Sequence, residues 1–323
     1  MNKFLKRVIL FCSPLLILLL FFEIFLRNIN TLYLEKKNGL LSQGDSIQLL
    51  ILGNSHGAMD INPDKFDMYA YNMAQVNQSL YFDKRITLKY LDKLPNLKLV
   101  LINLDFHSLY FSSEGYMDTW TYYAYGINYK NEIPLLSKVS YVYGYTPKMS
   151  FEFLKRVYTT RNTPIGRHLV DINKGQYNNT NIEKGWLPFV ETDTANMNAN
   201  AYSERAKSFN ETVEKNAGEK SQVIADLEDF IILLKSKNIT PVFITTPCYP
   251  GFKKLLDKNI MPQNKIDIDS LCEKYNIKYF NFYDEPFNEE EYHDCDHLNK
   301  TGANRFSKMI NDKLKIEFAG YYK

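Results

Sequence analysis

The chain has 323 residues, and its 39 Lys and Arg nearly balance its 37 Asp and Glu, for a formal net charge of +2. Such a balance provides no basic field for a phosphate backbone, and no nucleic-acid motif is present, so we expect no nucleic-acid partner. Hydrophobic residues make up 45% and charged residues 24%, which excludes a globally disordered chain.

An apolar run covers residues 8–26 and contains one acid, Glu23. The run is long enough to cross a bilayer as a helix. Basic residues within 1–7 predict that this short end stays cytoplasmic and that the remaining domain is extracytoplasmic, periplasmic or on the cell surface. A cleaved signal peptide is the alternative, but no small-residue cleavage site follows the run. We therefore predict a single-pass protein with a retained signal anchor.

Glu23 and Arg27 lie four residues apart, on one face of a helix. They can pair at the outer interface, or Glu23 can contact a partner in the membrane. Residues 27–46 are polar and mixed, which predicts a tether between the bilayer and the domain at 47–320.

Five apolar segments predict buried strands, at Gln48–Leu52, Tyr69–Met73, Leu97–Asp105, Ile239–Thr246 and Ile277–Phe282. Periodic apolar residues predict helices at Leu80–Leu94, Gln222–Lys235, Asn264–Tyr275 and Lys300–Ile316. The alternation of the two is typical of an α/β three-layer sandwich with a five-stranded, mostly parallel, flavodoxin-like sheet.

The periodic signal fades between about 110 and 215, a stretch too long for a bare loop in a compact domain. We interpret it as an insertion that packs over one end of the sheet. Its sequence predicts a helix at Met149–Tyr158 and an exposed, Asn-rich loop at Tyr177–Ile182. Aromatic residues are 15% of the chain and serve either core packing or the lining of a groove.

The first predicted strand ends in Gly53-Asn54-Ser55-His56-Gly57. A serine in a glycine-flanked turn after a buried strand can raise its hydroxyl above the sheet edge, where backbone N–H groups face a developing oxyanion. Near the other end of the chain, Asp294 precedes His297 by three residues, just before the closing helix. A serine nucleophile needs a base and an acid that orients the base. We therefore predict Ser55 as nucleophile, His297 as base and Asp294 as orienting acid.

These two blocks resemble the SGNH (GDSL-type) hydrolase superfamily, in which the serine follows strand one and an Asp-x-x-His block precedes the last helix. The resemblance covers about 47–105 and 216–318 and leaves the insertion unexplained. Within the superfamily the chain resembles the membrane-anchored, exported branch near DltD-like and AlgJ/AlgX-like proteins, which act in acyl transfer to cell-surface polymers. Asn54 stands where the family has Asp.

The family's middle blocks, which carry a Gly and an Asn for the oxyanion hole, are poorly matched. The resemblance implies that Asn72 or Asn77 stands in for the first block. Asn103, Asp105 or His107 lies where the second belongs. His107 is either a substrate-side group or a structural histidine, and the same alternatives hold for His56.

Other interpretations of these residues remain. Each motif alone is typical of a turn or of a capped helix start. His293, Asp294, Asp296 and His297 offer metal-ligand types, but no second cluster accompanies them, so we expect neither metal nor cofactor. We expect Asp296 to be a solvated neighbour. The four cysteines do not match a zinc site or a disulfide framework, although Cys248 and Cys295 could form one bridge.

The sequence thus predicts an exported, membrane-tethered serine esterase or O-acyltransferase whose substrate is an acyl ester of a cell-surface glycan or polysaccharide. Partners would be the membrane, through the N-terminal helix, and other envelope polysaccharide proteins. The alternative, motivated by the poor middle blocks, is a non-catalytic glycan-binding or assembly subunit of an envelope polysaccharide machine.

Overall fold

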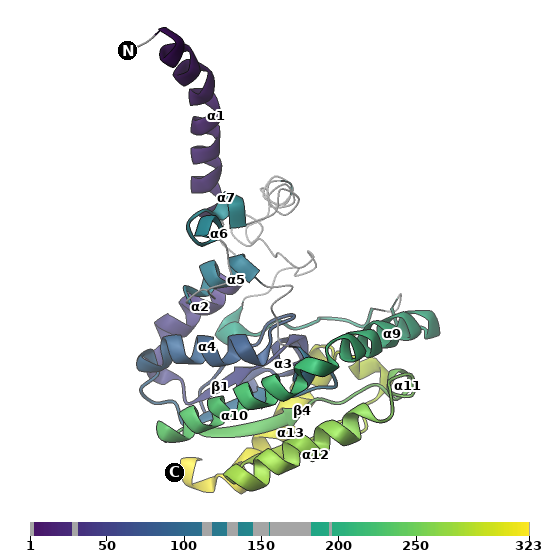
Figure 1. The fold of residues 1–323 in the computed structure, drawn as a ribbon. Coiled ribbons are helices and arrows are strands. Elements are labelled where there is room, and N and C mark those ends of the chain that lie inside the picture. The colour runs from purple at the N-terminus through teal and green to yellow at the C-terminus, as the bar shows by residue number, and fades with distance from the viewer. Residues whose placement is uncertain are drawn as a thin grey trace. The chain divides into compact units, whose positions relative to one another are not determined.

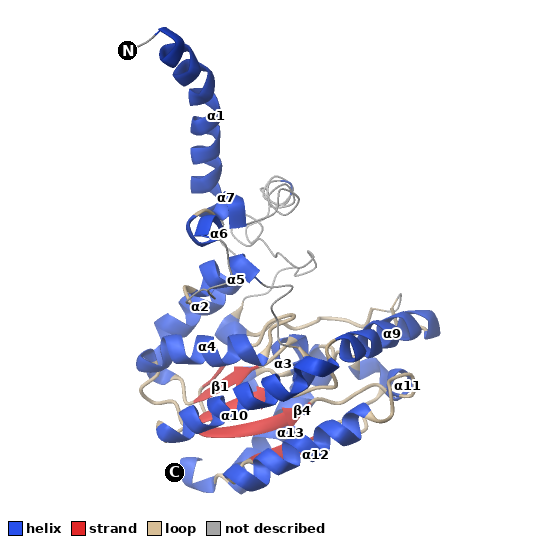
Figure 2. Ribbon diagram, viewed as in Figure 1, coloured by secondary structure: helices blue, strands red, loops and turns tan. Residues whose placement is uncertain are grey.

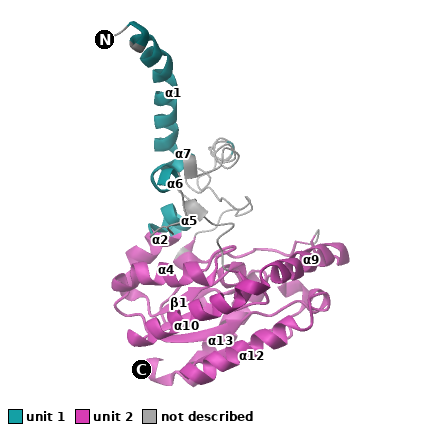
Figure 3. Cartoon of the chain, viewed as in Figure 1, with its two compact units in different colours: residues 1–35, 117–179 teal, residues 36–116, 180–323 magenta. Residues whose placement is uncertain are grey.

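A computed structural model describes residues 3–27, 32–111, 118–127, 135–144, 155, 182–193 and 196–322 (Figure 1). The predicted helix at Met149–Tyr158, apart from Lys155, and most of the Asn-rich loop lie outside the described residues. The chain divides into two compact units. Unit 1 consists of Met1–Glu35 with Met117–Asn179, and unit 2 of Lys36–Tyr116 with Thr180–Lys323 (Figure 3).

Unit 2 contains a five-stranded, all-parallel sheet, whose strands are drawn red in Figure 2. The strand order is β2-β1-β3-β4-β5. The strands are β1 Leu49–Leu52, β2 Ala70–Asn72, β3 Leu99–Asn103, β4 Thr240–Thr245 and β5 Lys278–Asn281. Each lies within a predicted strand, and the strand order is the flavodoxin-like one, so the predicted fold class is confirmed. The strands read as continuous apolar runs because both faces of a parallel sheet are covered.

The helices of unit 2 are α3 Ser55–Asp60, α4 Leu80–Tyr90, α9 Ala199–Lys215, α10 Lys220–Ser236, α11 Pro250–Lys253, α12 Ile260–Tyr275 and α13 Lys300–Glu317. Short 3-10 turns cover Gly44–Ser46, Pro63–Lys65, Leu91–Lys93, Ser108–Tyr110, Glu183–Gly185, Ala217–Glu219, Glu289–Glu291 and Ala319–Tyr322. The four predicted helices correspond to α4, α10, α12 and α13. α9 lies inside the stretch interpreted as an insertion.

Right-handed crossovers explain how the helices divide between the faces of the sheet. The chain steps from β1 to β2 in one direction, and from β2 through β3 and β4 to β5 in the other, so α3 lies on the opposite face from α4, α10 and α12. After β5, α13 returns to the α3 face, where Phe306, Ile310 and Leu314 pack into the core formed by one side of the strands. The carboxyl ends of β1, β3 and β4 therefore meet at one edge, beneath the loop that precedes α13.

The expected tether contains a helix, α2, at Leu32–Gln43. Its C-terminal part belongs to unit 2 and is fixed there by Tyr71, within β2, and by Tyr69, just before it. The Tyr71 hydroxyl donates to the Lys36 carbonyl at 2.8 Å, and the Tyr69 hydroxyl donates to Gln43 Oε1 at 2.7 Å. This segment is therefore part of the folded domain from Lys36 onward.

Unit 1 contains α1 Lys3–Arg27, α5 Asp118–Tyr125, α6 Leu135–Val139 and α7 Tyr141–Gly144. Lys6–Arg27 is long and apolar enough to cross a membrane, a property that signal sequences share. The Glu23 carboxylate pairs with Arg27 at 2.6 Å, as expected from their spacing. It also accepts the backbone N–H groups of Tyr141 and Val142, at 2.9 and 3.0 Å, and so caps the start of α7.

Candidate functional site

The turn from β1 into α3 presents Ser55 at the start of a helix. Gly53 has φ +130°, and a Cβ there would lie 2.7 Å from Asn103 Cβ, so only glycine fits. Asn54 Oδ1 accepts the His56 N–H at 3.0 Å and caps α3. Ser55 is thereby fixed as the first residue of α3, above the carboxyl end of β1.

Ser55 and His297, which are 242 residues apart in the chain, lie within hydrogen-bond distance. Ser55 Oγ is 2.9 Å from His297 Nε2, and on the other side of the ring His297 Nδ1 is 3.0 and 3.1 Å from the two oxygens of Asp294. Asp294 Oδ1 also accepts the backbone N–H groups of Asp296 and His297, at 3.0 and 2.8 Å. These bonds hold the imidazole with its Nδ1 toward a carboxylate and its Nε2 toward a hydroxyl.

Asp60, at the end of α3, connects the serine helix to the histidine loop. Its Oδ1 accepts the Leu298 N–H at 2.9 Å. The side chain is fully buried, and burial raises the pKa of Asp60 to about 8. Because α3 begins with Ser55, this bond helps to set the distance between Ser55 and His297.

A second imidazole, His56, is buried next to the first. Its Nδ1 is 2.7 Å from Asp105 Oδ2, and its Nε2 is 3.4 Å from Asp296 Oδ2. The Thr246 hydroxyl donates to Asp105 Oδ1 at 3.0 Å and fixes that carboxylate. Burial alone would lower the pKa of His56, but Asp105 and Asp296 outweigh it and hold the pKa well above its ordinary value. His56 is therefore an imidazolium held between two acids.

Asp296 is buried and ion-paired, so the expectation of a solvated neighbour is wrong. The Arg205 guanidinium, from α9, donates to Asp296 Oδ2 from Nε at 3.1 Å and from Nη2 at 2.9 Å. Arg205 and the histidines lower the pKa of Asp296 well below its usual range, against the effect of burial. No sequence signal marks this partner, because Arg205 precedes Asp296 by 91 residues and lies in a polar helix.

Both acids of the histidine loop, Asp294 and Asp296, raise the pKa of His297. Burial alone would lower its pKa and His56 opposes protonation too, but Asp294 and Asp296 outweigh them, so the pKa of His297 lies above its ordinary value. Asp296 Oδ1 is 3.5 Å from His297 Nδ1, longer than either Asp294 contact. Asp294 is therefore the acid that directly holds the ring.

The two asparagines expected near the oxyanion differ in their surroundings. Asn72 Nδ2 donates to the Gly57 and Ile61 carbonyls, at 2.8 and 2.9 Å, so both its N–H bonds are occupied and it fixes the loop around α3. Asn77 is exposed, with φ +56°, in the turn after β2. We assign neither as an oxyanion donor.

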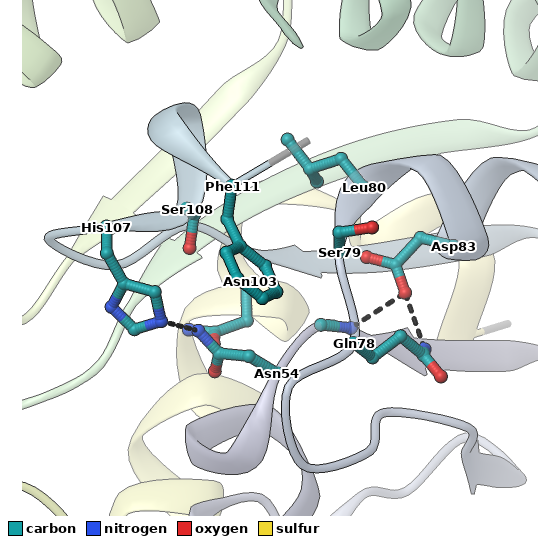
Figure 4. A pocket seen from close by; sticks show the side chains of 10 residues that line it. Asn54, Gln78, Ser79, Leu80, Asp83, Asn103, His107, Ser108 and Phe111 are labelled. Carbon is teal, nitrogen blue, oxygen red and sulfur yellow. Dashed lines mark hydrogen bonds between the residues drawn. The ribbon is translucent and has the colours of Figure 1, made fainter. Parts of the chain in front are cut away.

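His107 is a partly buried histidine whose Nδ1 atom is buried, and it has the properties of a neutral donor. Asn54 Oδ1 is used by the His56 N–H, so Asn54 Nδ2 is the group facing His107 Nε2 at 3.4 Å, and Nε2 must accept (Figure 4). The proton then resides on Nδ1, which is buried and has no hydrogen-bond partner among the described residues. Burial lowers the pKa of His107 to about 4, so the ring stays neutral near pH 7.

Within the described part of the chain, His56, Asp296 and His297 form a group that could hold a metal, with ligand atoms within 4.8 Å of one another. Their donor atoms already have partners. His56 Nδ1 faces Asp105, and the two nitrogens of His297 face Asp294 and Ser55. Arg205 supplies a cation to Asp296. The residues present fit a hydrogen-bonded acid–base cluster better than a metal centre.

Other residues singled out in the sequence have structural environments. His293 stacks on Phe189, with ring centroids 3.8 Å apart. All four cysteines are free, so Cys248 and Cys295 do not form the bridge considered above.

Comparisons with known proteins gave no matching family model and no matching curated relative. Among solved structures, a protein described provisionally as an acylhydrolase from Bacteroides fragilis is 12% identical, with a TM-score of 0.37, over 84% of this chain and 87% of its own. A provisionally described platelet activating factor from Streptococcus pneumonia is 10% identical, with a TM-score of 0.42, over 94% and 98%. A GDSL-like lipase from Bacteroides thetaiotaomicron is 11% identical, with a TM-score of 0.40, over 88% and 100%. Because these values are low, we derive function from this chain's own geometry.

Proposed function

We propose that this chain is a serine esterase or O-acyltransferase that works through Ser55, His297 and Asp294. The observation that carries the proposal is the hydroxyl of Ser55 at 2.9 Å from a ring nitrogen whose opposite nitrogen faces a carboxylate. A neutral His297 held in this way keeps its proton on Nδ1, toward Asp294, and leaves Nε2 free to accept.

In the proposed reaction His297 Nε2 takes the Ser55 proton as Oγ attacks the ester carbonyl carbon. Asp294 stabilises the imidazolium that forms, and the imidazolium then donates its proton to the leaving alcohol oxygen. The acyl group remains on Ser55. Water or a sugar hydroxyl next gives its proton to His297 and attacks the acyl carbon, and Ser55 leaves with the returned proton.

The oxyanion of each tetrahedral intermediate needs N–H donors. We assign the Ser55 backbone N–H, at the first position of α3, and the Nδ1–H of His107 to this role. His107 fits because its N–H is buried without a partner among the described residues and its ring is neutral. His107→Ala should lower kcat by about 10²–10³-fold, a loss typical of removing one oxyanion donor. His107→Asn, which keeps a donor amide, should recover part of that rate.

Covalent labelling of Ser55 tests the proposal most directly. A fluorophosphonate should label the wild-type protein at Ser55 and leave Ser55→Ala unlabelled. His297→Ala should label slowly, because the hydroxyl then lacks its base. A wild-type protein that folds but takes no label at Ser55 would contradict the proposal and favour a non-catalytic, glycan-binding role for the same fold.

For the setting of the reaction we propose a retained anchor at α1, an extracytoplasmic domain and acyl esters of a cell-surface glycan as substrates. The motivation is the apolar length of Lys6–Arg27 with basic residues before it. Protease added to intact spheroplasts should digest the domain. Complete protection, with digestion only after lysis, would place the domain in the cytoplasm.

A further inference from the structure

A small polar hollow lies directly beside the turn that presents Ser55, between β1, β3 and α4 (Figure 4). The hollow is small and opens to solvent. Its lining consists of Gly53, Asn54, Gln78, Ser79, Leu80, Asp83, Asn103, His107, Ser108 and Phe111. Apart from His107, the proposed esterase reaction uses none of these side chains.

The amide donors of this lining already have acceptors. Gly53 N and Gln78 Nε2 both donate to Asp83 Oδ1, at 3.2 and 2.6 Å (Figure 4). Asn54 Nδ2 faces His107, and Asn103 Nδ2 donates to Asp105 Oδ1 at 3.1 Å. A ligand that needs N–H donors from these amides would find them occupied.

Several acceptors of the lining, by contrast, have no donor among the described residues. Four buried oxygens have no hydrogen-bond partner among the described residues: Gln78 Oε1, Ser79 Oγ, Asp83 Oδ2 and Asn103 Oδ1. Their side chains are at most 4% exposed, so bulk solvent does not satisfy them. A buried acceptor without a donor loses its hydration and gains nothing in return, which destabilises the fold. The hollow is therefore built to receive a group that donates several hydrogen bonds.

The charge of Asp83 indicates which kind of hydrogen-bond donor the hollow would bind. Asp83 is fully buried and forms no ion pair within the described part of the chain, since the neighbouring Lys84 pairs instead with Asp229. A carboxylate in such a position favours a cationic donor, and a primary ammonium combines one positive charge with three N–H bonds. Burial without a cation raises the pKa of Asp83 to about 7.

We propose that this hollow is a binding site for a primary ammonium group, held by Asp83 Oδ2 and Ser79 Oγ. The ammonium comes either from a free small amine or from an ester substrate that carries one. The site exists independently of catalysis by Ser55, and only the second source depends on the proposed esterase function.

The first experiment measures binding of methylammonium to the full-length protein by calorimetry at constant ionic strength. Tetramethylammonium, which has the charge but no N–H bond, serves as the control ligand. Wild type should bind methylammonium and not tetramethylammonium. Equal heats for the two cations, or no saturable binding of methylammonium, would overturn the proposal and leave ordered water as the occupant.

Asp83→Asn is the decisive variant. Asn Oδ1 can still accept from Gly53 and Gln78, while an amide donor replaces the free oxygen. Methylammonium affinity should fall by ~10-fold to ~100-fold, as expected for a lost charge-assisted hydrogen bond. The matched control is Asp229→Asn, an acid-to-amide change at an exposed site outside the hollow. Equal losses in both variants would overturn the assignment.

Ser79→Ala is a second variant in case Asp83→Asn does not fold. It removes one free acceptor without changing charge and should weaken methylammonium several-fold. Unchanged affinity in Ser79→Ala would remove Ser79 from the site and so contradict the proposal as stated.

Two isosteric esters distinguish the sources of the ammonium. The 4-nitrophenyl esters of glycine and of propionic acid differ by NH₃⁺ in place of CH₃. A preference for the glycine ester that Asp83→Asn abolishes assigns the site to the substrate. Binding of methylammonium without such a preference assigns it to a free amine. If neither ester turns over and Ser55 takes no fluorophosphonate, the esterase proposal fails while the binding result stands.

Discussion

The two imidazoles of the site, His297 and His56, lie with ring centroids 4.7 Å apart and are both buried, but they have different partners. His297 faces a carboxylate on one side and the Ser55 hydroxyl on the other. His56 faces carboxylates on both sides. A ring that must gain and lose a proton needs one neutral neighbour, whereas a ring between two acids stays charged.

Asp296 lies between the two rings, which makes the contrast sharper. Its Oδ2 is 2.9 Å from Arg205 and 3.4 Å from His56, so two cations offset its charge near His297. Without them, Asp294 and Asp296 together would stabilise the protonated form of His297 and weaken it as a base. We interpret His56 and Arg205 as positioning residues that keep His297 titratable.

The largest expected difference in kcat/KM is between replacement of His297 and replacement of His56. His297→Ala should lower kcat/KM for a 4-nitrophenyl ester by ~10³-fold or more, as should Ser55→Ala, because members of such a unit act together. His56→Gln should lose only ~10-fold, because it contacts no reacting atom in the proposed mechanism. Equal losses at both histidines, with unchanged circular dichroism, would remove the distinction.

The second-largest difference in activity is expected between replacements of the two acids in the histidine loop, Asp294 and Asp296. Asp294→Asn should lower kcat by ~10²–10⁴-fold, because an amide can hold the ring in the wrong tautomer. Asp296→Asn should lose much less activity but unfold at a lower temperature, because it leaves Arg205 without its acid and His56 with Asp105 alone. Kinetics and thermal unfolding of both variants provide the comparison. If Asp296→Asn is the more damaging to kcat, the orienting acid is misassigned.

The pH profile tests how the neighbours act on His297. The pKa of His297 lies above its ordinary value, so kcat/KM should fall as the pH drops through that raised pKa and the base becomes protonated. Asp294→Asn should move this limb to lower pH. His56→Gln should move it to higher pH, because the His56 charge lowers the pKa of His297. A flat profile, or strict dependence on an added divalent metal, would favour a metal site instead.

The smallest expected effect is on stability and concerns Asp60. Asp60 binds the histidine loop through the Leu298 N–H and forms no hydrogen bond with His56 or His297 among the described contacts. Its pKa is about 8 in the folded state against an ordinary value of 3.8, so the fold favours the protonated form and stability should decline as pH rises between them. Asp60→Asn keeps an acceptor for Leu298 N and should reduce this decline by roughly 1–3 kcal/mol. Urea unfolding at pH 5 and at pH 8 measures it; an identical decline in variant and wild type would contradict it.

The sequence predicts the sheet well, because strands buried on both faces leave apolar runs such as Leu49–Leu52 and Leu99–Asn103. The proximity of Ser55 to the Asp294–His297 pair can be predicted from the sequence for a related reason. The chemistry of each is local, and a parallel sheet brings the ends of its strands to one edge.

What the sequence does not predict are partners joined only by the fold. Arg205 lies in α9, whose surface is mostly polar and whose buried residues are only Ala206 and Val213, so no apolar run marks the helix. Asn72 resembles an oxyanion donor in sequence but donates its amide hydrogens to two carbonyls. Asp83 is one acid among several on an amphipathic helix, and only its burial distinguishes it.

The cap that Glu23 places on α7 affects how this protein can be prepared. Truncation of the chain after Arg27, the usual route to a soluble sample, would remove the acceptor of two backbone N–H groups and the Arg27 contact with the Val139 carbonyl. The segment at 135–144 would then lose its attachment to α1 while the sheet domain stayed intact. Detergent-purified full-length protein is therefore the proper reference for any activity assigned to the residues around α5–α7.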